Sequence, residues 1–154
     1  MNLLFDTSVW VDDLRHGVLR FVLPRVRGRY FLWLDSVAAA ELIAGCSTRQ
    51  DRRVVSGLIA PFERAGRVVT PSQRDFVRAA EALSKLRGAG LTLKNPGAAL
   101  LDALQAANAV RVGALLVTEN VSDFRKLARF LPASISSFGD FSRTLGSASP
   151  ARKA

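Results

Sequence analysis

The stretch Leu3-Leu4-Phe5-Asp6-Thr7-Ser8 opens the chain with a short apolar run that ends at an aspartate. Such a run predicts a buried strand, and a helix is expected after it from about residue 9 to residue 15, ended by Gly17. The same order of strand and helix recurs along the chain. Because the predicted strands are continuously apolar rather than alternating, they are typical of a parallel sheet covered by helices on both faces. The sequence therefore predicts an α/β fold.

The other predicted elements follow from apolar runs and from residues that start and stop helices. Asp35 or Ser36 can cap a helix at 37–44, and Asn95 is the expected cap of a helix that begins at Pro96. Strands are expected at about 30–34, 67–70, 114–118 and 135–138, and further helices at about 52–65, 71–87 and 123–130. The segment 142–154 is small, polar and basic, which predicts a disordered tail after one domain at 1–141.

Length and composition indicate a single domain outside the membrane. The chain has 154 residues, of which 49% are hydrophobic, and this is enough for one real core. No apolar run has the length of a bilayer span, and the N-terminus has no features of a secretory signal. The single cysteine, Cys46, suits a reducing compartment. We therefore expect a cytoplasmic protein.

The charge balance points to a polyanionic partner. Lysine and arginine total 22 against 13 aspartates and glutamates, which gives a net charge of +9. Such an excess favours nucleic acid as the partner. The alternative is a soluble basic protein that has no polyanionic partner.

Missing residues exclude several kinds of site. One histidine, His16, and one cysteine cannot build a zinc site. The chain has no Gly-x-x-x-x-Gly-Lys-Ser/Thr loop and no Gly-x-Gly-x-x-Gly turn, so a nucleotide cofactor has no support. A Ser-His-Asp triad would have to use His16. His16 lies beside Gly17 at a predicted helix end, where a cationic side chain is favourable without any catalytic role.

Two acidic residues lie in helices where a charge is unfavourable. Glu41 is the only charged residue of the predicted helix at 37–44, and a lone carboxylate there is costly unless it is paired or bound to a metal. Asp102 is flanked on its helix face by alanines and a glycine, so that helix can approach the sheet closely. The alternative for each is an exposed acid, and Gln105 and Asn108 support this alternative for Asp102.

Asp6 and Asp123 are expected at the same edge of the sheet, near the carboxyl ends of two strands, where α/β sheets place their sites. Each also precedes a predicted helix, where aspartate is a favoured N-cap. Converging carboxylates select a hard cation, Mg²⁺ or Mn²⁺. Such an ion activates water and neutralises charge during phosphodiester hydrolysis. The sequence therefore predicts a metal-dependent site of four acids: Asp6, Glu41, Asp102 and Asp123.

Four stretches, at 4–8, 41–45, 101–107 and 116–124, match a known pattern in order and spacing. With them the chain resembles a PIN domain over about residues 1–141 and, more narrowly, the ribonuclease toxins of VapBC-type toxin–antitoxin pairs. The resemblance implies a parallel five-stranded sheet flanked by helices and an Mg²⁺- or Mn²⁺-dependent endoribonuclease that hydrolyses RNA. It also implies a homodimer and a small antitoxin protein that occupies the active site.

The resemblance also implies roles for single residues. Asp6, Glu41 and Asp102 match the three core acidic positions, with Asp6 and Asp102 as metal ligands, and Asp123 matches the fourth. Glu119 is an alternative to Asp123. Two polar positions that orient ligands or water are matched by Thr118 and Asn120. The segment 46–95 matches no motif, and we expect it to carry the dimer or partner surface.

Two other functions compete with this hypothesis. A nucleic-acid-binding module without catalysis would explain the net charge of +9, but it gives no role to Glu41 and Asp102. A haloacid-dehalogenase-like phosphatase also has an aspartate after its first strand. That class needs a second aspartate two residues later, where this chain has Ser8.

Overall fold

The sheet has five strands in the order β3-β2-β1-β4-β5, and every neighbouring pair is parallel. They belong to a computed structural model that describes residues 1–147. The strands are β1 (Asn2–Phe5), β2 (Phe31–Asp35), β3 (Val68–Val69), β4 (Ala114–Thr118) and β5 (Ser134–Ser137). The predicted α/β fold with a parallel five-stranded sheet is confirmed.

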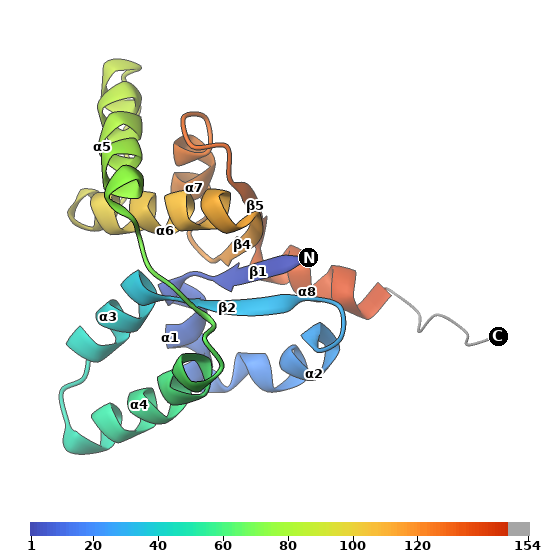
Figure 1. The fold of residues 1–154 in the computed structure, drawn as a ribbon. Helices are drawn as coiled ribbons and strands as arrows, with labels where there is room; N and C mark the ends of the chain where they lie inside the picture. The colour runs from blue at the N-terminus through green and yellow to red at the C-terminus, as the bar shows by residue number, and fades with distance from the viewer. Residues whose placement is uncertain (148–154) are drawn as a thin grey trace.

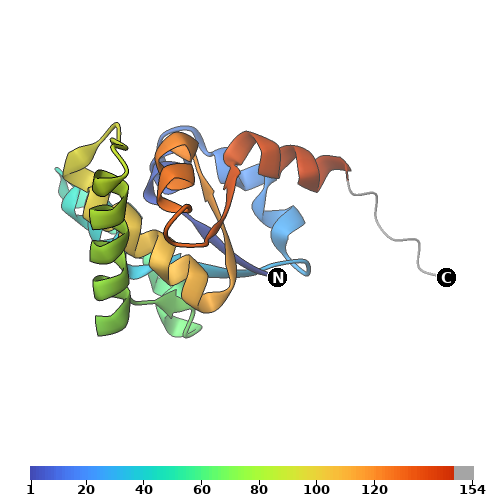
Figure 2. The same cartoon turned by 90° about the horizontal axis from the view of Figure 1, so that it is seen from above.

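Helices cover both faces of the sheet (Figure 1). One face carries α1 (Thr7–His16), α2 (Leu23–Val26), α3 (Ser36–Ala44), α4 (Arg49–Arg64), α8 (Phe138–Ser147) and a 3₁₀ turn at Val18–Phe21. The other face carries α5 (Gln73–Gly88), α6 (Ala99–Val112) and α7 (Val121–Leu127), with a 3₁₀ turn at Pro96–Ala98 before α6. In the view from above, α5 and α8 lie on opposite sides of the molecule (Figure 2).

The two cores follow from the pleat of the strands. Leu3 and Phe5 are fully buried against the helices of the first face, and Leu4 between them is fully buried against the helices of the second. Because successive side chains of a strand point to opposite faces, a continuously apolar strand fills both layers. Among residues 1–147, no helix combines the length and the apolar character that crossing a membrane requires.

The helix starts are fixed by short polar side chains. Asp35 accepts a hydrogen bond from the Val37 N–H at 2.8 Å and so caps α3. Thr48 and Asp51 form a capping box at the start of α4, as Ser72 and Asp75 do for α5. The Thr48 box explains why α4 begins three residues before the predicted start at 52.

Three sequence predictions are wrong, two on helix starts and one on the C-terminal segment. Asn95 makes no side-chain cap, because the 3₁₀ turn at Pro96–Ala98 comes between it and α6. Asp123 does not precede α7 but lies in its first turn, and Asn120 takes the N-cap position. The segment 142–147 is not a disordered tail, because it belongs to α8. The rest of the predicted tail, 148–154, lies outside the described residues.

The order of the strands creates a switch point between β1 and β4. The chain leaves β1 for β2 and β3 on one side, and it returns through α5 and α6 to β4 on the other side. The carboxyl ends of two such strands form a crevice in which α/β proteins place their sites. Asp6 follows β1 directly, and its N–H donates to the Val117 carbonyl of β4 at 2.9 Å.

Replacing Leu145 by alanine tests whether α8 is part of the domain. Leu145 is buried in the core of the first face, so Leu145→Ala should lower the free energy of unfolding by about 2–5 kcal/mol. The control is Arg143→Ala, which removes only an exposed ion pair to Asp140 and should cost less than about 1 kcal/mol. Denaturant unfolding measures both variants, and equal stabilities would contradict the docking of α8.

Candidate active site

Asp6 is directed into the switch point. It stands at the N-cap position of α1, yet its side chain makes no cap hydrogen bond, so the interpretation of Asp6 as a simple cap is wrong. Its Oδ2 instead accepts hydrogen bonds from the Ser8 hydroxyl at 2.6 Å and the Thr118 hydroxyl at 2.8 Å. Asp6 is 3% exposed. These two donors hold a buried carboxylate at the ends of β1 and β4.

Glu41 reaches the same place from α3. Its Oε2 accepts hydrogen bonds from the Thr7 hydroxyl and from Nε2 of Gln105, the latter at 3.1 Å. Burial raises the pKa of Glu41, the hydrogen bond from Thr7 opposes this rise, and the charge of Asp6 adds to it. Glu41 is therefore a half-buried carboxylate that neighbouring segments hold by one oxygen.

Asp102 lies in the first turn of α6 and is 8% exposed, so the alternative of an exposed acid is wrong. Burial raises its pKa to about 7, and the charges of Asp6, Glu41 and Asp123 add to the rise. Within residues 1–147, the Asp102 carboxylate has no hydrogen-bond donor. It is a buried carboxylate surrounded by like charges.

Asp123 is fully buried in α7 and is already partly neutralised. It accepts hydrogen bonds from the Lys94 N–H at 2.8 Å and from Nδ2 of Asn120 at 3.4 Å, and its Oδ1 lies 3.3 Å from Nζ of Lys126. The carboxylate therefore ties the loop before α6 to α7, while its charge still acts on Asp102.

The two predicted supporting residues link these carboxylates. Thr118 donates to Asp6, and its hydroxyl accepts the N–H of Asn120 at 2.9 Å. Asn120 in turn reaches Asp123. Glu119, the alternative fourth acid, is exposed, and its pKa is raised by partial burial and by the charge of Asp12 rather than by the four predicted acids.

Sequence analysis missed Asp35 as a fifth acid and Gln105 as a buried partner. Burial raises the pKa of Asp35 to about 6, hydrogen bonds from Asn108 and Val37 oppose the rise, and the charges of Asp6 and Glu41 add to it. The missed signal was its place directly at a strand's carboxyl end. The two polar residues that suggested an exposed helix, Gln105 and Asn108, are both fully buried.

The donor set has the chemistry of a site for a hard divalent ion. It offers only oxygen ligands, and Asp102 has neighbouring negative charges but no donor to offset them. Among residues 1–147, no group of three or more His, Cys, Asp or Glu side chains is arranged so that it could hold a metal ion. Mg²⁺ does not require one, because it usually binds through one or two carboxylates and keeps several waters. Asp6 and Asp102 fit such a role.

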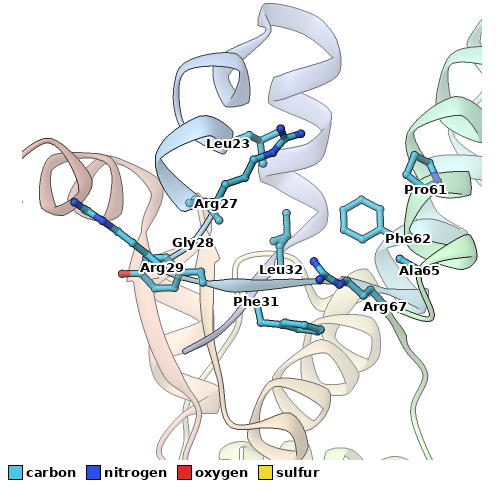
Figure 3. A pocket seen from close by; sticks show the side chains of 12 residues that line it. Leu23, Arg27, Gly28, Arg29, Phe31, Leu32, Pro61, Phe62, Ala65 and Arg67 are labelled. Atoms are coloured by element: carbon cyan, nitrogen blue, oxygen red, sulfur yellow. The ribbon is translucent and has the colours of Figure 1, made fainter. Parts of the chain in front are cut away.

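A separate cavity lies at the other edge of the sheet. Its volume is about 840 Å³, and residues from α2, the start of β2 and the end of α4 line it. Arg27, Arg29 and Arg67 stand around its apolar side chains, with the Arg67 guanidinium 3.9 Å from the centre of the Phe31 ring (Figure 3). The cavity contains none of the predicted site residues, so its size alone does not make it the active site.

Fold and site together define an α/β domain with buried carboxylates at the switch point of its sheet. The chain belongs to the PIN domain family, because the model of that family matches residues 3–130.

Solved structures with the same fold come from toxin–antitoxin complexes. A chain in the crystal structure of VapBC2 from Rickettsia felis bound to a promoter DNA fragment is 20% identical, with a TM-score of 0.67 and coverage of 90% of this chain and 99% of that one. A chain of VapBC-1 from nontypeable Haemophilus influenzae is 18% identical, with the same TM-score and coverage. A chain of VapBC-5 from Mycobacterium tuberculosis is 18% identical, with a TM-score of 0.56 and coverage of 88% and 96%. A search of curated protein sequences finds no match.

The raised pKa of Asp102 predicts how the stability of the metal-free protein depends on pH. The pKa of Asp102 is near the ordinary aspartate value of 3.8 in the unfolded chain and about 7 in the folded protein. The folded state therefore holds the proton longer, and stability should fall as pH rises through this window. Asp102→Asn removes this loss and should be more stable than the wild type at pH 8 in EDTA by about 1–2 kcal/mol.

Thermal melts of both proteins at pH 5 and pH 8 in EDTA measure this effect. The advantage of Asp102→Asn should be smaller at pH 5 than at pH 8, because only part of the window between the two pKa values has been crossed at pH 5. A variant that is less stable than the wild type at pH 8 would show that Asp102 makes favourable contacts as an anion. This result would contradict its repulsion by neighbouring carboxylates.

Proposed function

We propose that this chain is an Mg²⁺- or Mn²⁺-dependent endoribonuclease that acts in the cytoplasm as the toxin of a toxin–antitoxin pair. The observation that carries the proposal is Asp102, a buried carboxylate without a donor among residues 1–147, whose pKa is raised by burial and further by three other carboxylates. Two principles support a metal site there: buried charges need compensation, and oxygen-only sites select hard cations. PIN domains generally use divalent ions.

Each acid has a role in this mechanism. Asp6 and Asp102 would hold the cation, which would supply Lewis acidity toward a water and toward phosphate oxygens. Glu41 is suited to take the proton of the attacking water, because its pKa is raised by burial. Thr7 and Gln105 occupy its Oε2, which leaves Oε1 to accept the proton. Asp123 keeps the loop before α6 in place through Lys94.

The charge distribution supports nucleic acid as the substrate. The chain carries a net charge of +9 although five acids gather at one edge of the sheet. The surface elsewhere is therefore more basic than the total indicates, and α7 next to the site contributes Arg125 and Arg129 around its C-terminal end. Such residues bind phosphates independently of base sequence. RNA rather than DNA rests on the resemblance to VapBC-type toxins.

A groove beside Glu41 supports a protein partner that blocks the site. It has a volume of about 390 Å³ and lies between α1, α3 and the start of α4, with Glu41 in its wall. Leu14 and Val54 give it exposed apolar surface, as expected of a site for an amphipathic segment. The structures of VapBC complexes named above agree with an antitoxin as this partner.

Cleavage assays with Asp102→Asn test the proposed activity. The wild type should cleave RNA in Mn²⁺ or Mg²⁺ and lose this activity in EDTA, because the carboxylates act through the ion. Asp102→Asn should cleave at least about 100-fold more slowly, since a neutral amide is a poorer ligand. RNA binding at fixed salt should persist or strengthen, because the net charge rises by one.

The control for this variant is Asp140→Asn, which makes the same charge change at an exposed residue. It should cleave like the wild type. Full activity of the wild type in EDTA would contradict the requirement for a metal ion. Full activity of Asp102→Asn would contradict the catalytic role of Asp102. A wild type that binds RNA but never cleaves it would favour the non-catalytic nucleic-acid-binding module.

The proposed homodimer has a candidate surface in the unassigned segment 46–95. Phe76 and Val77 of α5 are 50% and 52% exposed. Phe76→Asp should therefore convert the dimer to a monomer at micromolar concentration, as measured by light scattering. Phe21→Asp is the matched control, since Phe21 is 66% exposed on the other face of the sheet. A wild-type monomer would contradict the homodimer.

A further inference from the structure

Helix α6 carries a row of polar side chains at every third position: Asp102, Gln105, Asn108 and Arg111. Residues three apart are neighbours on a helix surface. The members after Asp102 each contact a different part of the chain. Gln105 contacts Thr7 and Glu41, Asn108 contacts Asp35, and Arg111 contacts Asp75 and the Thr70 carbonyl.

Only the nitrogen of the Gln105 side-chain amide makes hydrogen bonds among the described residues. Its Nε2 donates to Oε2 of Glu41 and to the Thr7 hydroxyl, both at 3.1 Å, and Thr7 donates to the same Oε2. Its Oε1 is buried and has no partner among the described residues. An unpaired buried carbonyl destabilises a protein. A leucine would fill the same space without that cost, so the amide serves Glu41 and not the stability of the core.

Asn108 differs from Gln105 although it is equally buried. Its Nδ2 donates to Asp35 at 3.0 Å, and its Oδ1 accepts from Arg111 at 3.0 Å. Both ends of this amide are satisfied. Asp35 in turn caps α3, and Arg111 is paired with Asp75 at the start of α5. The amide of Asn108 thus joins three helices, which is a structural role.

We propose that Gln105 is a positioning residue of the acidic site, which fixes the Glu41 carboxylate by Oε2 and leaves Oε1 for a water bound to the divalent ion. This role rests on the proposed metal-dependent function. Gln105 is fully buried and touches no substrate, so it acts only through Glu41. Partners of this kind orient groups at metal sites, and their loss typically costs about 10- to 100-fold in metal affinity or activity.

The test compares Gln105→Leu with Asn108→Leu, which removes the other buried amide of the same helix. In EDTA, Gln105→Leu should melt at or above the wild-type temperature, because it removes the unpaired Oε1. Its Mn²⁺ affinity, measured by calorimetry, should fall by about 10-fold or more. The Mn²⁺ concentration for half-maximal cleavage should rise in parallel, and the KM for RNA should stay unchanged. Asn108→Leu should melt below the wild type and keep its Mn²⁺ affinity within about threefold, since its partner Asp35 has no proposed role toward the ion or its water.

A second variant keeps the proposal falsifiable if Gln105→Leu folds poorly. Thr7→Val removes the other donor to the same carboxylate oxygen and should lower the Mn²⁺ affinity in the same direction. The double variant should lose less than the sum of the two free-energy changes, because both donors act on one carboxylate.

Each outcome separates the positioning role from the function on which it rests. A wild type that binds no Mn²⁺ and cleaves no RNA overturns both. A wild type that binds and cleaves, with Gln105→Leu within twofold of it in Mn²⁺ affinity, overturns only the role of Gln105. An equal loss of affinity in Asn108→Leu also overturns that role, because the loss would then follow from the stability of α6.

Discussion

The repulsion between carboxylates buried at the switch point of the sheet is the constraint on which the other features depend. Asp6, Glu41 and Asp102 come from three separate segments and meet where, among residues 1–147, no cationic side chain is paired with Asp102. Like charges in low-dielectric surroundings oppose ionisation and oppose folding. The protein offsets this with neutral donors from Thr118, Ser8, Thr7 and Gln105, which stabilise single oxygens without filling the site with positive charge.

Close approach of α6 to the sheet makes this arrangement possible. Every residue from 102 to 109 is buried, and the apolar positions that face the second core are mostly alanines. Small side chains let a helix lie near its neighbours, so the polar side chains between them reach α1, α3 and the end of β2. Larger residues at those positions would move Asp102 and Gln105 away from Glu41. Packing and site geometry are therefore set by the same helix.

The charges of the protein are separated by depth. Five of the thirteen acids lie at the carboxyl edge of the sheet and are buried or half-buried, whereas the arginines and lysines that produce the net charge of +9 lie mainly on the surface. A polyanion would be attracted by the basic surface and repelled by the acidic site until a cation is bound at that site. The same separation distinguishes two of its hollows, because the groove of about 390 Å³ has Glu41 in its wall, whereas the arginine-lined cavity at the start of β2 contains none of the five acids.

The sequence by itself determined the strands, the parallel sheet and the choice of Asp6, Glu41 and Asp102 as candidates, because apolar runs, strand ends and a lone charge in an apolar helix are local patterns. Only the tertiary structure decided how the acids are held. Gln105 meets Thr7 across 98 residues and Glu41 across 64, and no local pattern reports such a pairing. For the same reason, the polarity of Gln105 suggested exposure although its amide is buried. The basic composition after residue 141 likewise concealed a helix whose burial depends on residues far away in the chain.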